Sequence, residues 1–218
     1  MTTNTIYIIS GLGADKRMFA KLHFEGFTVH HLAWITPLKK EPISAYAKRF
    51  CELIKEENAI IIGLSFGGMM AVELSKIKRF KKIILISSAK GKNEIAWYYR
   101  WIGKLGVHRL FSGSFYKRSN AFVYWLFGIK EKEEKRLLKA ILNDADPTFF
   151  YWAIDKIVTW KNEDIPHNIF HIHGTADRLL PLRFVKADAV IQKGGHFMVY
   201  NKAKEILNIL RVKPFFNL

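Results

Sequence analysis

Cysteine is almost missing from this sequence of 218 residues, in which Cys51 stands alone. A single thiol excludes intramolecular disulfide bonds, which small secreted domains use to compensate for a small core. The first residues also lack the basic stretch and the long apolar segment of an export leader. We therefore expect a cytoplasmic protein.

Long hydrophobic runs are missing as well. The longest uncharged apolar stretch, residues 121–129, is about half of the roughly 18 residues that a membrane-spanning helix requires. No linker rich in serine, glycine or proline divides the chain. The sequence thus predicts no transmembrane segment and a single domain over residues 1–218.

Acidic residues are scarce, with 19 Asp and Glu against 35 Lys and Arg, for a formal net charge of +16. Such a charge favours an acidic substrate, a membrane surface or nucleic acid. The most basic run, residues 76–82, has no nucleic-acid-binding signature beside it, so we expect no nucleic-acid partner. The charge alone does not distinguish a substrate from a membrane surface, or from neither.

Short apolar runs alternate along the chain with segments of helical spacing. This alternation is typical of an α/β protein with a mostly parallel sheet, right-handed crossovers and helices on both faces. Strands are expected at residues 5–10, 27–32, 59–62, 82–87, 169–173 and 189–192, and helices at residues 42–56, 66–76 and 202–211.

The alternation stops between residues 88 and 164, where helical patterns recur at residues 130–142 and 146–160. An insertion of this size usually covers the ends of the strands, so we expect a mostly helical cap at about residues 90–143. Its excess of Lys and Arg can attract an anionic group, and its aromatic side chains can line an apolar acyl pocket, with Trp97, Trp101 and Trp125 as candidates. The aromatic residues of this segment are Trp97, Tyr98, Tyr99, Trp101, Phe111, Phe115, Tyr116, Phe122, Tyr124, Trp125 and Phe127.

A GxSxG pattern formed by Gly63, Ser65 and Gly67 lies between an expected buried strand and an expected helix. A strand-to-helix turn that lifts a serine into the open must be sharp, and it requires residues without side chains two positions to either side. Gly68 adds further clearance. The five-residue pattern by itself is equally compatible with a glycine-rich turn around an inert serine, so other residues must decide.

A serine hydroxyl becomes a strong nucleophile only when a base takes its proton and an acid orients that base. Asp177 follows one buried strand and His196 follows the last one, at the strand ends where open α/β sheets place their sites. Alone, Asp177 would be read as a turn residue and His196 as a loop imidazole. The order Ser65, Asp177, His196 predicts a catalytic triad. Asp155 and Asp164 are the alternative acids.

Three other residues are candidate ligands of a metal or a substrate. His171 and His173 face the same side of a strand, but no third ligand accompanies them, so we expect no metal and no cofactor. Arg17 lies one turn from the glycine-containing turn after the first strand and is a candidate for binding an anionic substrate, with a surface or structural role as the alternative.

Four motifs together resemble the α/β-hydrolase superfamily over essentially the whole chain: the SGLG turn, the GLSFGG elbow, the HGTAD loop and the GGHF turn. In that superfamily two backbone amides hold the oxyanion, and the resemblance assigns them to Phe66 and Leu12. Ser10 departs from the pattern, since relatives often have histidine there. The chain also begins close to its first core strand, which implies a trimmed sheet of about six parallel strands.

The resemblance implies a serine hydrolase that cleaves a carboxylic ester or thioester of a small, apolar or anionic acyl substrate through an acyl-serine intermediate. Serine at position 65 argues against haloalkane dehalogenases and epoxide hydrolases, whose nucleophile is a carboxylate. Two alternatives stay open because a fold does not fix a reaction. One is a lyase or carbon–carbon bond hydrolase on the same triad, and the other is a non-catalytic ligand-binding protein.

Overall fold

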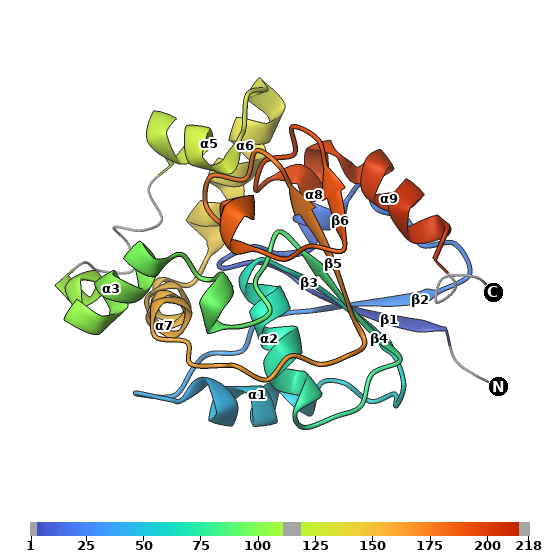
Figure 1. The fold of residues 1–218 in the computed structure, drawn as a ribbon, viewed down its shortest axis with the longest axis horizontal. Coiled ribbons are helices and arrows are strands. Elements are labelled where there is room, and N and C mark those ends of the chain that lie inside the picture. Colours follow the sequence, from blue (N-terminus) through green and yellow to red (C-terminus); the bar gives the residue numbers. More distant parts are fainter. Residues whose placement is uncertain (1–3, 111–118, 214–218) are drawn as a thin grey trace.

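One sheet of six parallel strands organises the chain (Figure 1). The computed structural model describes residues 4–110 and 119–213, so the predicted aromatic residues Phe111, Phe115 and Tyr116 lie outside the described residues. The expected sheet of about six parallel strands is confirmed, in the order β2-β1-β3-β4-β5-β6. The strands are β1 Thr5–Ile9, β2 Thr28–Leu32, β3 Ile60–Leu64, β4 Lys82–Ile86, β5 Ile169–Gly174 and β6 Ala189–Ile191.

Helices cover both faces of this sheet. Figure 1 shows α1 (Ile43–Cys51) and α2 (Phe66–Ser75) on one side, and α8 (Met198–Asn201) and α9 (Ala203–Arg211) on the other. Alternate residues of each strand point to opposite faces, so that Ile6 packs in one apolar cluster and Tyr7 in the other. Burial on both faces explains why the inner strands β1, β3, β4 and β5 read as nearly continuous apolar runs, whereas the edge strands β2 and β6 are partly exposed.

Helix α1 ends at Cys51, earlier than the predicted limit at residue 56. The chain tightens there into turns in which the amides of Leu53 and Ile54 donate to the carbonyls three residues earlier. Ile54 nevertheless stays buried against the core. The helical spacing of apolar residues therefore continues past the end of α1 into a turn, and this is why the predicted helix is too long.

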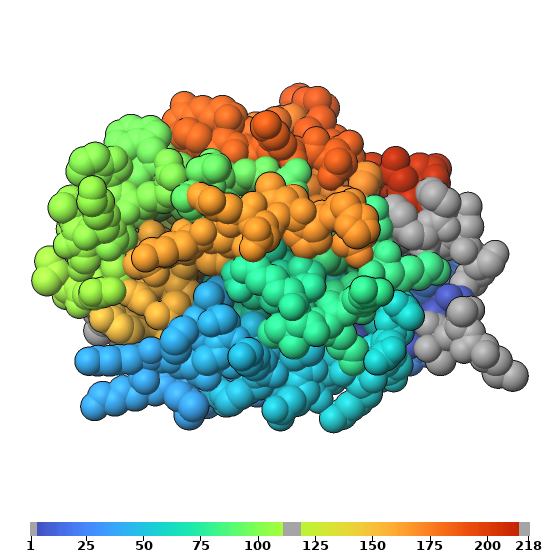
Figure 2. Space-filling model, turned by 60° about the horizontal axis from the view of Figure 1, so that its bottom comes forward, coloured from blue at the N-terminus to red at the C-terminus, as the bar shows by residue number. Residues whose placement is uncertain are grey.

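The segment between β4 and β5 is largely helical, as expected for the insertion. It holds η2 (Lys92–Glu94), α3 (Trp97–Leu105), η3 (Val107–Leu110), α5 (Ala121–Phe127), α6 (Lys132–Asp144) and α7 (Pro147–Val158). Figure 2 shows the part coloured light green forming one end of the molecular surface. Leu138, Ile141 and Leu142 of α6 pack into the core cluster shared with α9, so this part of the predicted cap also completes the core. No helix among the described residues is long and apolar enough to span a membrane.

The strand order places a topological switch point between β1 and β3. The chain leaves β1 for β2 at the edge, then returns to β3 on the other side of β1. The loops that follow β1 and β3 therefore run in opposite directions, and open α/β sheets place their binding sites at such a switch point. Ser65 follows β3 directly, and η1 (Lys16–Phe19) follows the loop after β1.

Candidate active site

Ser65 occupies a strained turn between β3 and α2. Its backbone has φ 51° and ψ −119°, a conformation that L-residues rarely adopt. The flanking glycines are required because neighbouring backbone leaves no room for a side chain. A Cβ on Gly63 would lie 2.4 Å from the Gly68 Cα atom, and one on Gly67 would lie 2.3 Å from the Ile9 carbonyl oxygen. The glycine spacing in the sequence therefore reflects the close approach of α2 to β1 and β3.

His196 joins the serine to the acid. Its Nε2 atom lies 3.0 Å from Ser65 Oγ, and its Nδ1 atom lies 2.8 Å from Asp177 Oδ2. A carboxylate can only accept, so Nδ1 carries the proton and the unprotonated Nε2 accepts from the serine hydroxyl. Asp177 and His196 are each 4% exposed, while Ser65 is half-buried. The structure thus brings the three predicted residues together as one hydrogen-bonded chain with the hydroxyl at its open end.

The Asp177 carboxylate is held by its own loop. Its Oδ1 atom accepts from the backbone amides of Leu179 at 3.0 Å and Leu180 at 2.8 Å. These bonds turn the other oxygen, Oδ2, toward His196. The loop after β5, residues 175–180, is called the acid loop, and it fixes the orientation of the imidazole.

Two fully buried histidines of β5 support that loop from behind. His173 Nε2 lies 2.8 Å from the Leu180 carbonyl oxygen, and His173 Nδ1 lies 3.2 Å from His171 Nε2. Burial lowers the pKa of both imidazoles, so both are neutral at physiological pH. Since a carbonyl only accepts, His173 Nε2 carries its proton, and His171 Nε2 donates to His173 Nδ1. The sequence identified this pair as possible metal ligands but did not predict that it supports the acid loop.

No metal site emerges from the described residues, since no group of three His, Cys, Asp or Glu side chains is placed to hold an ion. His171 instead donates its backbone amide to Asp188 Oδ2 at 2.7 Å, which ties β5 to the start of β6. Hydrogen bonds therefore account for both ring nitrogens of His173, whereas the buried His171 Nδ1 has no hydrogen-bond partner among the described residues.

The two predicted oxyanion amides belong to segments that border the Ser65 turn. Phe66 is the first residue of α2, where backbone N–H groups point out of the helix. Leu12 lies in the loop after β1, whose Gly11 carbonyl accepts from the Ala14 amide at 3.0 Å and from Trp34 Nε1 at 3.1 Å. A Cβ on Gly11 would lie 3.4 Å from Ser65 Cβ, so this loop passes directly beside the serine. Within the described part of the chain, neither the Phe66 nor the Leu12 amide donates to a protein acceptor.

Ser88 also supports the turn and was not predicted. Its hydroxyl donates to the Ser65 carbonyl oxygen at 2.6 Å, and it occupies the space that a Cβ on Gly68 would need. Ser88 follows β4, the neighbour of β3 in the sheet. Only the strand order reveals this contact, since no local motif surrounds the residue.

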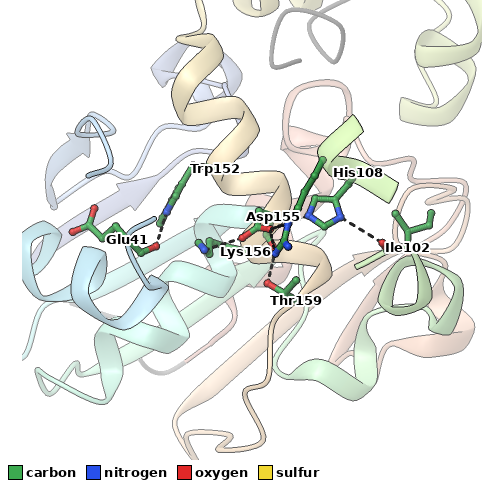
Figure 3. Close-up of polar contacts among 8 residues, drawn as sticks. Glu41, Ile102, His108, Trp152, Asp155, Lys156 and Thr159 are labelled. Carbon is green, nitrogen blue, oxygen red and sulfur yellow. Dashed lines mark hydrogen bonds and ion pairs between the residues drawn. The ribbon is translucent and has the colours of Figure 1, made fainter. Parts of the chain in front are cut away.

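The alternative acid Asp155 lies elsewhere. Figure 3 shows its carboxylate turned toward His108, whose Nε2 atom is 2.8 Å from Asp155 Oδ1. Lys156 and Arg109 also donate to this carboxylate, and despite its burial these partners lower the pKa of Asp155 to about 2. Neither Asp155 nor Asp164 is among the described hydrogen-bond partners of His196. Asp177 is the acid that the structure places against the imidazole.

Arg17 is occupied by carboxylates. Its guanidinium forms ion pairs with Asp15 at 2.6 Å and with Asp144 at 2.7 Å, which links η1 to the end of α6. These partners raise the pKa of Arg17 further above its ordinary value. The geometry favours the structural role over the binding of an anionic substrate.

The three tryptophans predicted to bind substrate lie in two places. The Trp125 ring lies under the Arg178 guanidinium at 4.6 Å, beside the acid loop. Trp97 and Trp101 are more than half exposed, and with Arg100 and Lys104 they line a shallow hollow of about 200 Å³ that contains no triad residue. The sequence predicted a mostly helical insertion, but it predicted neither a helix at Trp97–Leu105 nor which of its faces points outward.

Phe127 and Tyr99 are two other aromatic residues of the insertion, and Phe127 contacts the triad. The Phe127 ring meets the His196 ring edge to face, with 5.3 Å between centroids, and its carbonyl accepts from the Phe197 amide at 3.1 Å. Tyr99 is half-buried, and burial, with smaller contributions from Tyr98 and Asp177, raises its pKa to about 12. The sequence included both in the aromatic set without singling them out.

No model of a known protein family and no curated protein matches this sequence. Solved structures do match it. A lipase-esterase related protein from Clostridium acetobutylicum has 16% identity and a TM-score of 0.68, with 96% of this chain and 94% of that chain covered. A 2-hydroxy-6-oxo-6-phenylhexa-2,4-dienoate hydrolase from Rhodococcus sp. has 18% identity and a TM-score of 0.66, with 96% and 89% covered. An alpha/beta hydrolase fold protein from Burkholderia ambifaria has 10% identity and a TM-score of 0.66, with 97% and 91% covered. At these identities the likeness is one of fold.

Proposed function

From its α/β-hydrolase fold, we propose that this chain is a serine hydrolase that cleaves a carboxylic ester or thioester through an acyl-serine intermediate. The observation that carries the proposal is the His196 imidazole, which lies within hydrogen-bond distance of both Ser65 Oγ, at 3.0 Å, and Asp177 Oδ2, at 2.8 Å. A nucleophile, a base and an orienting acid in this contact meet the geometric requirement for acyl transfer.

The reaction begins when Ser65 Oγ attacks the carbonyl carbon of the substrate and His196 Nε2 takes the hydroxyl proton. The resulting imidazolium gives that proton to the leaving alcohol or thiol, which breaks the ester or thioester bond. Water then attacks the acyl-serine, His196 takes a proton from the water, and the acid product leaves with the serine hydroxyl restored. Asp177 stabilises the positive imidazole in both halves of the reaction.

The developing oxyanion lies between the amides of Phe66 and Leu12. Neither amide has an acceptor among the described residues, and the positive end of the α2 dipole adds to the field at Phe66. A donor in such a position contributes about 3 to 4 kcal/mol to the stabilisation of the transition state. The short distance between the β1 loop and the serine turn supports this assignment.

The insertion at about residues 90–143 is proposed to select the acyl group. Phe127 meets the His196 ring edge to face, so aromatic surface from the insertion borders the triad. This contact favours an apolar acyl chain. The net charge of +16 favours substrates that also carry a negative group.

A fluorophosphonate probe tests the proposal. The wild type should be labelled at a single serine, and Ser65→Ala should not be labelled. Ser75→Ala is the matched control, because Ser75 lies at the far end of the same helix and should be labelled as the wild type is. Labelling that persists in Ser65→Ala, or that never appears in folded wild type, would refute the assignment.

A panel of acyl p-nitrophenyl and acyl-CoA esters of increasing chain length then defines the substrate class. Turnover of these esters is expected. Labelling of Ser65 without turnover of any ester would instead assign the triad to a lyase or carbon–carbon bond hydrolase.

A further inference from the structure

Helix α3 presents large apolar side chains to solvent. Trp97, Trp101 and Leu105 follow one another at intervals of four residues, so they share one face of the helix. They are 57%, 55% and 67% exposed, whereas Trp152 and Trp160 are each 6% exposed. Apolar residues that gather on one exposed face usually mark a binding surface. We call the surface formed by Trp97, Trp101 and Leu105 the docking face.

The opposite face of α3 is firmly attached to the molecule. Gly103 is buried against α7, and a Cβ on Gly103 would lie 2.2 Å from the Val158 carbonyl oxygen. Tyr99, on the same side as Gly103, is half-buried. The close approach that this glycine permits fixes the rotation of α3, so the exposure of the two tryptophans follows from the packing of the helix.

Basic residues border the apolar face. Arg100 and Lys104 are exposed, and within residues 4–110 and 119–213 neither has an ion-pair partner. The Lys104 ammonium lies 5.5 Å from the centre of the Trp101 ring. None of the residues 97–110 is acidic, and the whole chain carries +16. A partner that meets this face must offer both apolar and negatively charged groups.

We propose that α3 docks this protein on an anionic lipid surface. Trp97, Trp101 and Leu105 enter the boundary between head groups and acyl chains, while Arg100 and Lys104 meet lipid phosphates. Tryptophan favours that boundary, and basic residues beside an apolar helix face add attraction to anionic lipids. The helix is nine residues long, so it lies on the surface rather than across the bilayer.

A second copy of the chain fits this face less well. Pairing two copies through α3 would bring two sets of unpaired Arg100 and Lys104 together in an interface without acidic residues from residues 97–110. Like charges facing each other across an interface are unfavourable. A lipid surface supplies the opposite charge instead.

Vesicle co-sedimentation tests the proposal, with vesicles of phosphatidylcholine alone and vesicles in which phosphatidylglycerol replaces part of it. The Ser65→Ala variant is used throughout, so that binding is measured apart from any reaction and the result does not depend on the proposed activity. Binding to the anionic vesicles and little binding to the neutral ones is expected. Each basic residue near such a surface raises the partition coefficient about fivefold, so Arg100→Gln with Lys104→Gln should lower it about 25-fold.

The matched control is Arg79→Gln with Lys81→Gln. It removes the same charge from two exposed residues in the loop before β4, at the opposite edge of the sheet from the strand ends where the insertion begins. This pair should bind the anionic vesicles nearly as well as the parent does. An equal loss in both pairs would show that net charge alone drives binding, which would overturn the proposal.

The double variant Trp97→Ala with Trp101→Ala tests whether the apolar side chains of the docking face contribute to vesicle binding. Both side chains are exposed, so the melting temperature should stay close to that of the parent while vesicle binding falls at least tenfold. Unchanged binding in this folded variant would overturn the proposal. Sedimentation velocity without lipid adds a further check, since a dimer that this double change dissolves would assign the face to a second copy.

Discussion

Gly67→Ala separates the oxyanion loop from the serine turn without touching the triad. The added Cβ would lie 2.3 Å from the Ile9 carbonyl oxygen and 2.4 Å from that of Ser10, both of them backbone atoms. Ordinary contact requires about 3.5 Å, so α2 and the end of β1 must move apart by about 1 Å. The amides of Phe66 and Leu12 lie on the two sides of this gap, and their convergence on one oxygen is lost.

The expected effects on stability and activity differ in size. Forced overpacking costs about 1 to 3 kcal/mol, while alanine is about 1 kcal/mol better than glycine in a helix, so the net loss of stability is about 0 to 2 kcal/mol. For a chain of this size that lowers the melting temperature by no more than about 8 °C. Displacing one oxyanion donor should lower kcat/KM by about 100- to 1,000-fold. Calorimetry and ester hydrolysis measure the two quantities.

Ala71→Gly is the matched control, since Ala71 is buried one turn later in the same helix. It should cost about 1 kcal/mol of stability through helix propensity and leave kcat/KM within a few-fold of wild type. If Gly67→Ala lost no more activity than Ala71→Gly, the loop after β1 would not contribute to the oxyanion site.

Three further predictions concern Asp177, the neighbouring His173, and Asp155, which pairs with His108. Asp177→Ala should lower kcat by several powers of ten, and adding Ser65→Ala should lower it little further, because triad members act as a unit; multiplied losses would contradict this. His173→Phe should cost about 1 to 3 kcal/mol by unpairing the Leu180 carbonyl and should reduce kcat more than it changes KM, whereas wild-type kcat in the folded variant would deny His173 a positioning role. The folded-state pKa of Asp155 is depressed to about 2, so its stabilisation is present above pH 4 and is lost as the pH falls toward 2. Asp155→Asn should thus lower the melting temperature at pH 7 but much less at pH 2, and an equal decrease at both would refute the ionic explanation.

The sheet and the proximity of Ser65, Asp177 and His196 could be predicted from the sequence because their physical signals are local. Strands buried on both faces read as apolar runs, and the turn around Ser65 needs glycine where α2 passes close to β1 and β3. Asp177 lies a few residues beyond the buried strand β5, and His196 lies a few residues beyond the edge strand β6. Chain order and strand ends together indicated that the three residues meet.

The supporting contacts were not accessible, because they join segments distant in sequence. Ser88 reaches Ser65 only because β4 lies beside β3, and His173 supports Leu180 only once the acid loop folds back on β5. The orientation of α3 was also hidden. Its spacing is compatible with tryptophans facing inward or outward, and the contact of Gly103 with α7 decides between them.

The most direct test of the acyl-serine mechanism is to trap the intermediate. Wild-type protein is mixed with a p-nitrophenyl ester, quenched in acid within the first turnover, and digested for mass spectrometry. The mechanism predicts the acyl mass on the peptide that contains Ser65, and none in Ser65→Ala. Steady turnover with no acylated peptide, or an acyl group on a different residue, would contradict it.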